Sequence, residues 1–443
     1  MAKQSSTSGF GLDFLSLHPF VRSTVVDKLR GVIFGSALGD AVGLYTDDTD
    51  HALLIILSYL HNDRELLPHD LARRLRTWCE QGLKFLGRPP LGVGKTVETV
   101  ALDPGYLSNP TATALKYWVK GNYNVASNGS LMRTHPLGII CLGKPLNETF
   151  RVATDFSIVT HADPRCVVSC CVTTGLIRGV LRGEILGEED VDKVIEDAFE
   201  WVDRWVRKGR RYGEDIIKED AKGGGMEPQL NRKEFDRYVR VTDFDELQLD
   251  ETMGYVYKSL GAAILTLRLG MQRRPYLGES SNNSNSTETR DDPARPYHNL
   301  FEELITTLIM QGGDADTNSC IAGSLLGAWV GYTALPPHWR DGIQHHNWLL
   351  CKCNALAQTI GVVSDQLLLP GYRGSEDQDT RDDGGKGVLS KELEVQEEVF
   401  SDICLGPKEQ KKKKEDEIKT EETKKEEEKR EQKQGGIGRL SER

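Results

Sequence analysis

The stretch that decides the fold of this chain reads Gly312-Gly313-Asp314-Ala315-Asp316-Thr317, and it precedes a small-residue helix predicted over residues 318–332. A second stretch, near the N-terminus, has a matching pattern. It ends in Thr46-Asp47-Asp48-Thr49, before an apolar helix predicted over residues 51–60. Its glycines recur every four residues, at Gly31, Gly35, Gly39 and Gly43. We therefore expect the two stretches to meet.

The glycine spacing predicts close helix packing. Each glycine inside a helix costs about 1 kcal/mol relative to alanine, so the run at Gly35 and Gly39, echoed at Gly323 and Gly327, needs a compensating gain. Glycines four apart share one helix face and let a second backbone approach. Membrane helices use the same pattern, but a span needs about 20 apolar residues. Each run is shorter, and Asp40 interrupts the first. We predict a helical core away from any membrane.

The carboxylates of the two stretches predict a metal site. They would repel one another without a cation between them. An all-oxygen donor set suits Mg²⁺, Mn²⁺ or Ca²⁺, and four carboxylates can hold two divalent ions about 3.5–4 Å apart. Each half alone is also explained by an ordinary capped helix N-terminus, but both halves together favour metal. The predicted ligands are Thr46, Asp47, Asp48, Asp314, Asp316 and Thr317.

Four blocks of sequence resemble, in order, the signature blocks of the ADP-ribosylglycohydrolase family, over about residues 22–335. The blocks are Gly35 to Gly43, Thr46-Asp47-Asp48-Thr49, Asn128-Gly129-Ser130-Leu131-Met132-Arg133, and Gly312 to Thr317 followed by Ile321-Ala322-Gly323. The resemblance implies an all-α fold, a compact single-domain orthogonal helical bundle. It also implies a central binuclear Mg²⁺ site, with Mn²⁺ as an alternative, at the base of an ADP-ribose pocket.

The implied reaction is hydrolysis of the bond between ribose C1 of an ADP-ribosyl group and its acceptor. The metals would grip the ribose hydroxyls and position water. Asp47, Asp48 and Asp316 are the candidate catalytic residues, as metal ligands of which one also accepts the proton of the attacking water. The implied partner is an ADP-ribosylated protein or a small ADP-ribose conjugate. Serine, arginine, acetyl ester and polymer acceptors all stay open.

A glycine-rich loop over residues 87–96 invites comparison with a phosphate-binding P-loop. The comparison fails, because the first glycine of that motif would fall at Pro89. Gly92 and Gly94 can still offer backbone N–H groups to a phosphate, and the family resemblance strengthens that interpretation.

The remaining ligand-binding candidates come from the third signature block and from His161. In the family this block lines the ADP-ribose site, and His161 stands where the family places a pocket residue. For Arg133 we weigh a phosphate contact against a structural salt bridge, and slightly favour the structural role. Met132 fits core packing better than ligand contact, and His161 fits a buried, hydrogen-bonded histidine equally well. The candidates are Asn128, Gly129, Ser130, Met132, Arg133 and His161.

One feature departs from the family. Only Leu44 and Tyr45 separate Gly43 from Thr46, whereas family members carry a substantial segment there, in several cases with a mobile acidic residue that covers the substrate. The metal aspartates suffice without it, or the protein is a catalytically weak or inactive ADP-ribose-binding or interaction protein, or the chain is incomplete. A structural protein with capped helices is a further alternative.

The composition indicates one sizeable core with polar additions. The 443 residues are 38% hydrophobic, 7% aromatic and 28% charged. We expect a flexible N-terminus over 1–20 and a helical domain over 21–370 with loop insertions at 207–246 and 277–297. A disordered charged tail is expected over 371–443.

A net charge of −11 argues against direct nucleic-acid binding. Lys411 to Lys414 fit a nuclear import signal, but the nearly balanced Glu and Lys around them favour a solvated charge run. The nine cysteines show no zinc or disulfide spacing and fit a reducing compartment. No secretion signal or membrane span is indicated. We expect a cytoplasmic protein, with the nucleus as the alternative.

Further helices are predicted at regular intervals, because apolar residues recur with helical periodicity and strand alternation is nearly absent. They cover residues 21–43, 50–60, 70–85, 103–120, part of 150–182 and 250–268, and residues 338–369 close the folded part.

Overall fold

The computed structural model describes residues 11–16, 18–43, 46–207, 230–273, 295–364 and 369–382, and every regular element within these ranges is a helix. Two isolated bridges, Leu83–Arg88 and Ser127–Tyr255, are the only strand-like pairings there. The predicted all-α class is confirmed.

The α-helices follow one another in this order: α1 (Pro19–Gly43), α2 (Asp47–His61), α3 (Pro68–Gln81), α4 (Lys95–Ala101), α5 (Pro110–Lys120), α6 (His135–Ile140), α7 (Leu146–Ser157), α8 (Pro164–Arg182), α9 (Glu188–Arg207), α11 (Arg232–Val239), α12 (Val256–Gln272), α13 (Arg295–Ile309), α14 (Ala315–Val330), α15 (Pro337–Arg340) and α16 (His346–Thr359). The 3₁₀ turns are η1 (Asp13–Ser16), η2 (Lys84–Leu86), η3 (Asn128–Ser130), η4 (Cys141–Gly143), η6 (Phe244–Leu247), η7 (Tyr332–Ala334), η8 (Gly374–Glu376) and η9 (Gln378–Thr380).

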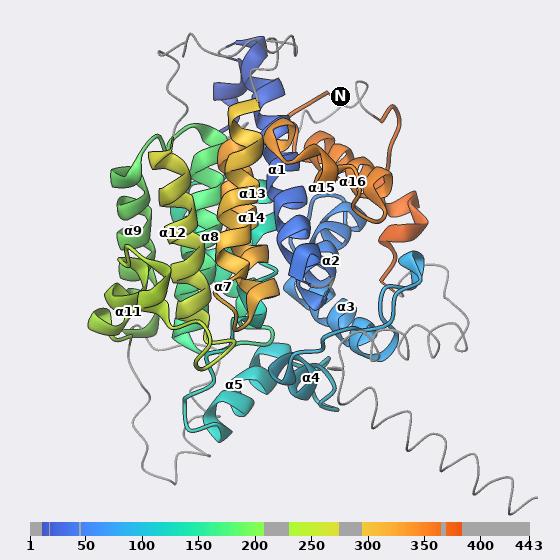
Figure 1. Cartoon of the computed structure of the whole chain (residues 1–443). Coiled ribbons are helices and arrows are strands. Elements are labelled where there is room, and N and C mark those ends of the chain that lie inside the picture. Colours follow the sequence, from blue (N-terminus) through green and yellow to red (C-terminus); the bar gives the residue numbers. More distant parts are fainter. Residues whose placement is uncertain are drawn as a thin grey trace, which may run out of the picture.

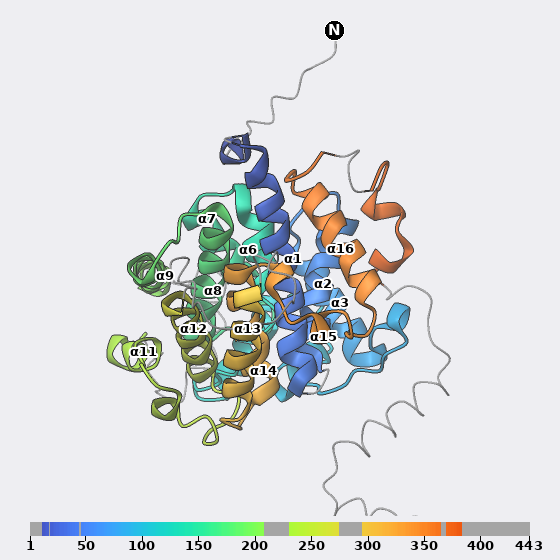
Figure 2. The same ribbon diagram turned by 45° about the horizontal axis from the view of Figure 1, so that its top comes forward.

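Helices α1 and α14 pack against each other at the centre of the molecule (Figure 1). On one side α14 contacts α8, α12 and α13, and α9 lies farther out. On the other side lie α2, α3 and α16 (Figure 2). The short helices α4 and α5 close the lower end in Figure 1. Helix α2 contacts both α1 and α14. The N-termini of α2 and α14, which carry the predicted acidic residues, therefore belong to neighbouring helices.

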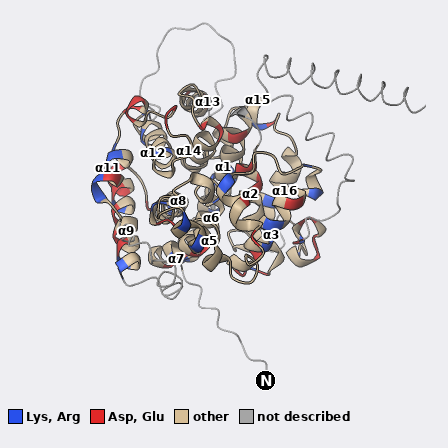
Figure 3. Cartoon of the chain, turned by 90° about the horizontal axis from the view of Figure 1, so that it is seen from below, with Lys and Arg blue, Asp and Glu red and all other residues tan. Residues whose placement is uncertain are grey.

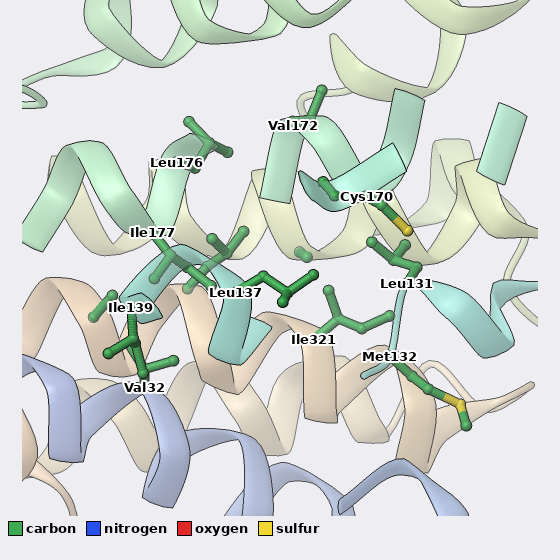
Figure 4. Packing of buried hydrophobic residues seen from close by; sticks show 14 of the residues in the cluster. Val32, Leu131, Met132, Leu137, Ile139, Cys170, Val172, Leu176, Ile177 and Ile321 are labelled. Carbon is green, nitrogen blue, oxygen red and sulfur yellow. The ribbon is translucent and has the colours of Figure 1, made fainter. Parts of the chain in front are cut away.

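Apolar side chains from α1, α6, α8 and α14 fill the space between these helices (Figure 4). Val32, Leu137, Ile177 and Ile321 are all at most 1% exposed. Within the described ranges α8 is the one helix long and apolar enough to cross a membrane, yet 94% of its most apolar window is buried in the fold. Its composition is that of a core helix.

Several helix starts differ from the predicted ones, and three of them have a clear local cause or consequence. Helix α2 begins at Asp47 instead of residue 50, which places Asp47 and Asp48 in its first turn. Helix α5 begins at Pro110, because the Asn109 side chain caps it by accepting from Ala112 N at 3.0 Å. Helix α12 begins at Val256, after a turn with positive φ at two residues, Thr252 and Gly254.

The predicted loop insertion at 207–246 is partly wrong. Residues 208–229 lie outside the described ranges, but α11 and η6 form within 230–246. Phe235 and Val239 are four residues apart and give α11 a buried face. The pattern is hard to recognise in the sequence because most of the other residues of α11 are charged. Charged residues gather on α9 and α11, which lie side by side (Figure 3). Arg232 of α11 forms a 2.6 Å ion pair with Glu196 of α9.

Helices α9 and α13 have no counterpart among the predicted elements. The six buried apolar residues of α9 nevertheless follow a helical spacing, at Val191, Val194, Ile195, Ala198, Phe199 and Val202. The second predicted insertion, 277–297, lies outside the described residues up to 294, and α13 begins at Arg295.

The predicted tail and N-terminus also need correction at their folded ends. Residues 371–382 dock on the helical domain, where Lys352 of α16 forms a 2.5 Å ion pair with Asp377. Gly374 packs directly on the backbone of Leu60 in α2. At the other end η1 buries Leu15. Residues 1–10 and 383–443 lie outside the described ranges.

Candidate metal and ligand site

Glycine packing brings the two acid-rich stretches together. A Cβ added at Gly35 would lie 2.3 Å from the Gly323 carbonyl oxygen, and one added at Gly323 would lie 2.1 Å from the Gly35 oxygen. Gly31 and Gly327 oppose each other in the same way. The prediction that the glycine runs mediate close helix packing is confirmed. This contact fixes α1 and α14 side by side.

Asp40, near the end of α1, holds the beginning of α2. One carboxylate oxygen accepts from Thr46 N at 2.9 Å and from Thr46 Oγ1 at 3.0 Å. The other accepts from the Thr49 N–H, at 3.1 Å, and from its hydroxyl. Burial raises the pKa of Asp40 to about 6, and the bonds from Thr49 and Thr46 partly offset that effect. Asp40 therefore supplies the cap that α2 would otherwise lack.

Ordinary capping does not explain the predicted metal residues. Thr46 and Asp314 are the N-cap residues of α2 and α14, and neither makes a side-chain capping hydrogen bond. Their side chains bond to other groups instead. The capped-helix alternative therefore loses its main support at both helices.

Asp48 joins the two stretches. Its Oδ2 accepts from Thr46 Oγ1 at 2.9 Å and from Thr317 Oγ1 of α14 at 3.1 Å. Its Oδ1 is buried and has no hydrogen-bond partner. Burial raises the pKa of Asp48 well above the usual range. The nearby carboxylates raise it further, and Asp40 has the strongest effect among them. A buried carboxylate oxygen without a donor is a poor arrangement for a stable core and a good one for a cation.

Asp47 and Asp314 flank this centre. Burial and then the charge of Asp40 raise the pKa of Asp47 well above its usual value. A backbone hydrogen bond from Gly94 lowers this pKa and so offsets part of the rise. Burial raises the pKa of Asp314 to about 6, although Asn128 Nδ2 donates to it at 2.7 Å. Asp316 lies in the first turn of α14 and is only partly buried. The predicted metal residues thus gather around Asp48.

The donor chemistry of this cluster fits a hard cation, because it offers carboxylate and hydroxyl oxygens with no imidazole or thiolate. The geometry is less complete. Within the ranges that the structure describes, no three acidic, histidine or cysteine side chains converge as in a formed metal site. Hydrogen bonds from Thr46 and Thr317 occupy Asp48 Oδ2 instead.

The predicted glycine loop lies beside the same centre. Gly92 has φ of +75°, and a Cβ there would lie 3.3 Å from Asp47 Oδ1 and from Thr46 Cβ. Gly94 has more space, since its Cβ would lie 3.8 Å from Asp47 Oδ2. Both glycines therefore lie against Asp47.

His161 belongs to a buried chain of hydrogen bonds. Its Nδ1 lies 2.8 Å from Thr160 Oγ1, which accepts from Arg133 Nη2 at 2.7 Å. Its Nε2 lies 2.9 Å from Ser127 Oγ, and Ser127 donates to Thr96 Oγ1 at 3.0 Å. Burial, and then the Arg133 charge, lower the pKa of His161 well below its usual value. His161 is therefore a neutral imidazole here.

Residues 22–366 match the family model described as ADP-ribosylglycohydrolase. The chain belongs to the ADP-ribosylglycohydrolase family. Family membership supports a hydrolase that acts on ADP-ribose conjugates. Among solved structures the chain is similar to one called "ADP-ribosylglycohydrolase-related protein complex", at 20% identity and a TM-score of 0.44, over 76% of this chain and 99% of the other. No curated protein sequence matches it.

Three candidates in the third signature block have mainly structural surroundings in this member of the ADP-ribosylglycohydrolase family. Met132 is 3% exposed and packs in the core (Figure 4). Ser130 is buried and accepts from Ser157 Oγ at 3.1 Å. Arg133 is fully buried and donates to Thr160, and it makes none of the ion pairs found among the described residues, so the predicted salt bridge is not formed and the phosphate contact stays a prediction.

Gly129 lies against the His161 ring, because a Cβ there would be 3.1 Å from His161 Nε2. Sequence reasoning missed Asp40, Ser127 and Thr96. Only the adjacency of Asp40 to the Gly39 packing site and of Ser127 to Asn128 gave any signal. Two cavities, of about 220 and about 200 Å³, lie elsewhere and include none of the predicted site residues.

Proposed function

We propose that this protein is a magnesium-dependent hydrolase that removes ADP-ribose from modified protein side chains or from related ADP-ribose conjugates. The observation that carries the proposal is the convergence of Thr46 and Thr317 on Asp48 Oδ2, while the other oxygen of the same carboxylate, Oδ1, is buried and has no donor. Family membership supplies the reaction class.

The residues that would hold two Mg²⁺ ions, or Mn²⁺, are Thr46, Asp47, Asp48, Asp314, Asp316 and Thr317. Bound divalent cations supply Lewis acidity and a template for oxygen ligands. Their charge would replace the protons that burial now favours on Asp47 and Asp48, and would neutralise the mutual repulsion of these carboxylates.

Hydrolysis breaks the bond from ribose C1 to the acceptor and forms a bond from C1 to water oxygen. One proton leaves the water and one reaches the departing acceptor. Asp47, Asp48 and Asp316 are the proposed catalytic residues, and one of these carboxylates accepts the water proton. Positive charge develops at C1 as the acceptor leaves, and the surrounding carboxylates stabilise that charge.

The chain's glycines and amides would orient the ADP-ribosyl group. Gly92 and Gly94 lie beside Asp47, and Asn128 donates to Asp314. Gly129 lies against His161, and we assign these two residues to a wall of the same site. We assign Arg133, Ser130 and Met132 to the support of that wall.

A second candidate function is binding of ADP-ribose with weak or no turnover. The observation in its favour is the short connection from α1 to α2. Leu44 and Tyr45, which lie outside the described residues, are the only residues between Gly43 and Thr46, so the connection contains no acidic residue to cover the substrate.

The test is release of free ADP-ribose from serine-modified and arginine-modified proteins, in Mg²⁺ and in chelator. We expect magnesium-dependent release that Asp316→Ala abolishes, and the consumed substrate will identify the acceptor. A folded protein that binds ADP-ribose but releases none from either substrate would replace the hydrolase with the binding function.

A further inference from the structure

The hydrogen-bond chain through His161 has a direction that its outer end determines. At the inner end, the Arg133 guanidinium can only donate. Its Nη2 donates to Thr160 Oγ1 at 2.7 Å, and the Thr160 proton is then available to His161 Nδ1, at 2.8 Å. The inner end is thus compatible with an unprotonated Nδ1.

The outer end gives the direction. A serine hydroxyl has one proton, and Ser127 uses it to donate to Thr96 Oγ1 at 3.0 Å. Ser127 must then accept from His161, whose Nε2 lies 2.9 Å away. The neutral His161 ring thus carries its proton on Nε2, which the inner end allows.

Thr96 is the last member of the chain. Because its oxygen accepts from Ser127, its own proton remains available, and no acceptor for it is found among the described residues. Thr96 stands two residues after Gly94, which donates to Asp47. Ser127 directly precedes Asn128, which donates to Asp314. Thr96 therefore belongs to the segment that contacts Asp47, and Ser127 to the segment that contacts Asp314.

We propose that Thr96 is a ligand-binding residue whose hydroxyl donates to an acceptor oxygen of ADP-ribose, and that Arg133 is a positioning residue that orients this donor through Thr160, His161 and Ser127. The proposal rests on the proposed function, since it takes ADP-ribose as the ligand. It gives the fully buried Arg133 a role without direct ligand contact.

The first experiment measures ADP-ribose affinity by calorimetry in Mg²⁺ for Thr96→Val and Thr96→Ser. We expect Thr96→Val to weaken binding about tenfold, because it removes one donor at nearly constant shape, and Thr96→Ser to remain within about twofold. Thr99→Val is the matched control. Thr99 lies on α4 too, but it is exposed, and its hydroxyl bonds to Lys95 O at 2.7 Å.

The second experiment reads the His161 tautomer from ¹⁵N shifts, with His161→Gln to assign the signal. We expect a neutral ring with the proton on Nε2, and Thr160→Val should release this preference and weaken ADP-ribose binding although Thr160 is 1% exposed. A ring protonated at Nδ1 overturns the relay. Equal affinity of wild type and Thr96→Val overturns the role of Thr96.

These outcomes separate the inference from the proposed function. If the wild-type chain does not bind ADP-ribose, the proposed function and the role of Thr96 both fail, whereas the tautomer measurement still supports or overturns the relay by itself.

Discussion

Thr317 of α14 donates its hydroxyl proton to Asp48 Oδ2 of α2 at 3.1 Å, across 269 positions of sequence. The two residues come from the two acid-rich stretches. They meet because Gly35 and Gly323 let α1 and α14 approach to backbone contact, and Asp40 then turns the beginning of α2 toward α14. The site is therefore a consequence of backbone packing, and changes in that packing should affect ligand and metal binding together.

We expect the metal-free protein to lose stability as pH rises. Burial raises the pKa of Asp40 and of Asp314 from 3.8 to about 6, so the folded state holds these protons more tightly than the unfolded state. Their contribution to stability is complete below pH 3.8 and is lost as pH rises through about 6. Mg²⁺ should restore stability over the same window, because it replaces the protons.

Calorimetric melting between about pH 4 and about pH 7, with and without Mg²⁺, checks this expectation. Asp48→Asn is the informative variant, since it removes a buried charge at constant shape. At pH 7 its metal-free form should melt no lower than wild type, and Mg²⁺ should no longer raise its melting temperature. Unchanged stabilisation of Asp48→Asn by Mg²⁺ would remove Asp48 from the metal site.

Gly35→Ala should destabilise the fold by several kcal/mol, although alanine favours a helix by about 1 kcal/mol over glycine. The new methyl group would lie 2.3 Å from the Gly323 carbonyl oxygen, so α1 and α14 must separate. Denaturant unfolding measures the loss. Gly187→Ala is the control, because nothing lies within 4 Å of its added Cβ. Equal stability of the two variants would contradict backbone contact between the central helices.

Gly92→Ala should weaken Mg²⁺ and ADP-ribose binding, since its Cβ would lie 3.3 Å from Asp47 Oδ1. The positive φ of +75° adds a backbone cost of about 1–2 kcal/mol. Gly183→Ala matches that cost, with φ of +71° and nothing within 4 Å. Both variants should lose similar stability in unfolding experiments, and only Gly92→Ala should lose affinity in titration calorimetry. Equal affinity of the two variants would place Gly92 outside the site.

The central packing was predictable because one residue type at one spacing carries it. Gly35 and Gly323 cost helix stability unless a backbone lies against them, and that cost is visible without a structure. The meeting of the two acid-rich stretches, which brings Thr317 to Asp48, followed from the charge of their carboxylates, because like charges cluster only where something such as a cation offsets their repulsion.

The supporting contacts were not predictable in the same way. In the sequence Asp40 only interrupts an apolar run. Its role depends on the beginning of α2, where Thr46 and Thr49 donate to its carboxylate. The chain from Arg133 to Thr96 crosses three separate segments, and no spacing relates them. Docking of residues 371–382 depends on polar pairs such as Lys352 with Asp377, whose composition resembles that of a solvated tail.

This docked segment should contribute measurably to stability. Lys352 is 5% exposed, and its ammonium lies 2.5 Å from Asp377 and 3.2 Å from Asp379. A chain that ends at residue 368 takes away both partners of this charge together with the packing of residues 369–382, which should lower the free energy of unfolding. A chain that ends at residue 382 keeps both partners and is the matched control.

We therefore expect the shorter chain to melt well below the longer one, with Lys352→Met recovering part of the difference because it removes the unpaired charge at similar volume. Gly374 packs against Leu60 of α2, the helix that begins with Asp47, so Mg²⁺ affinity should fall along with stability. If the two chains melted alike, the contacts of residues 369–382 would contribute nothing to the folded state, and the packing of α2 against its neighbouring helices would suffice to hold it.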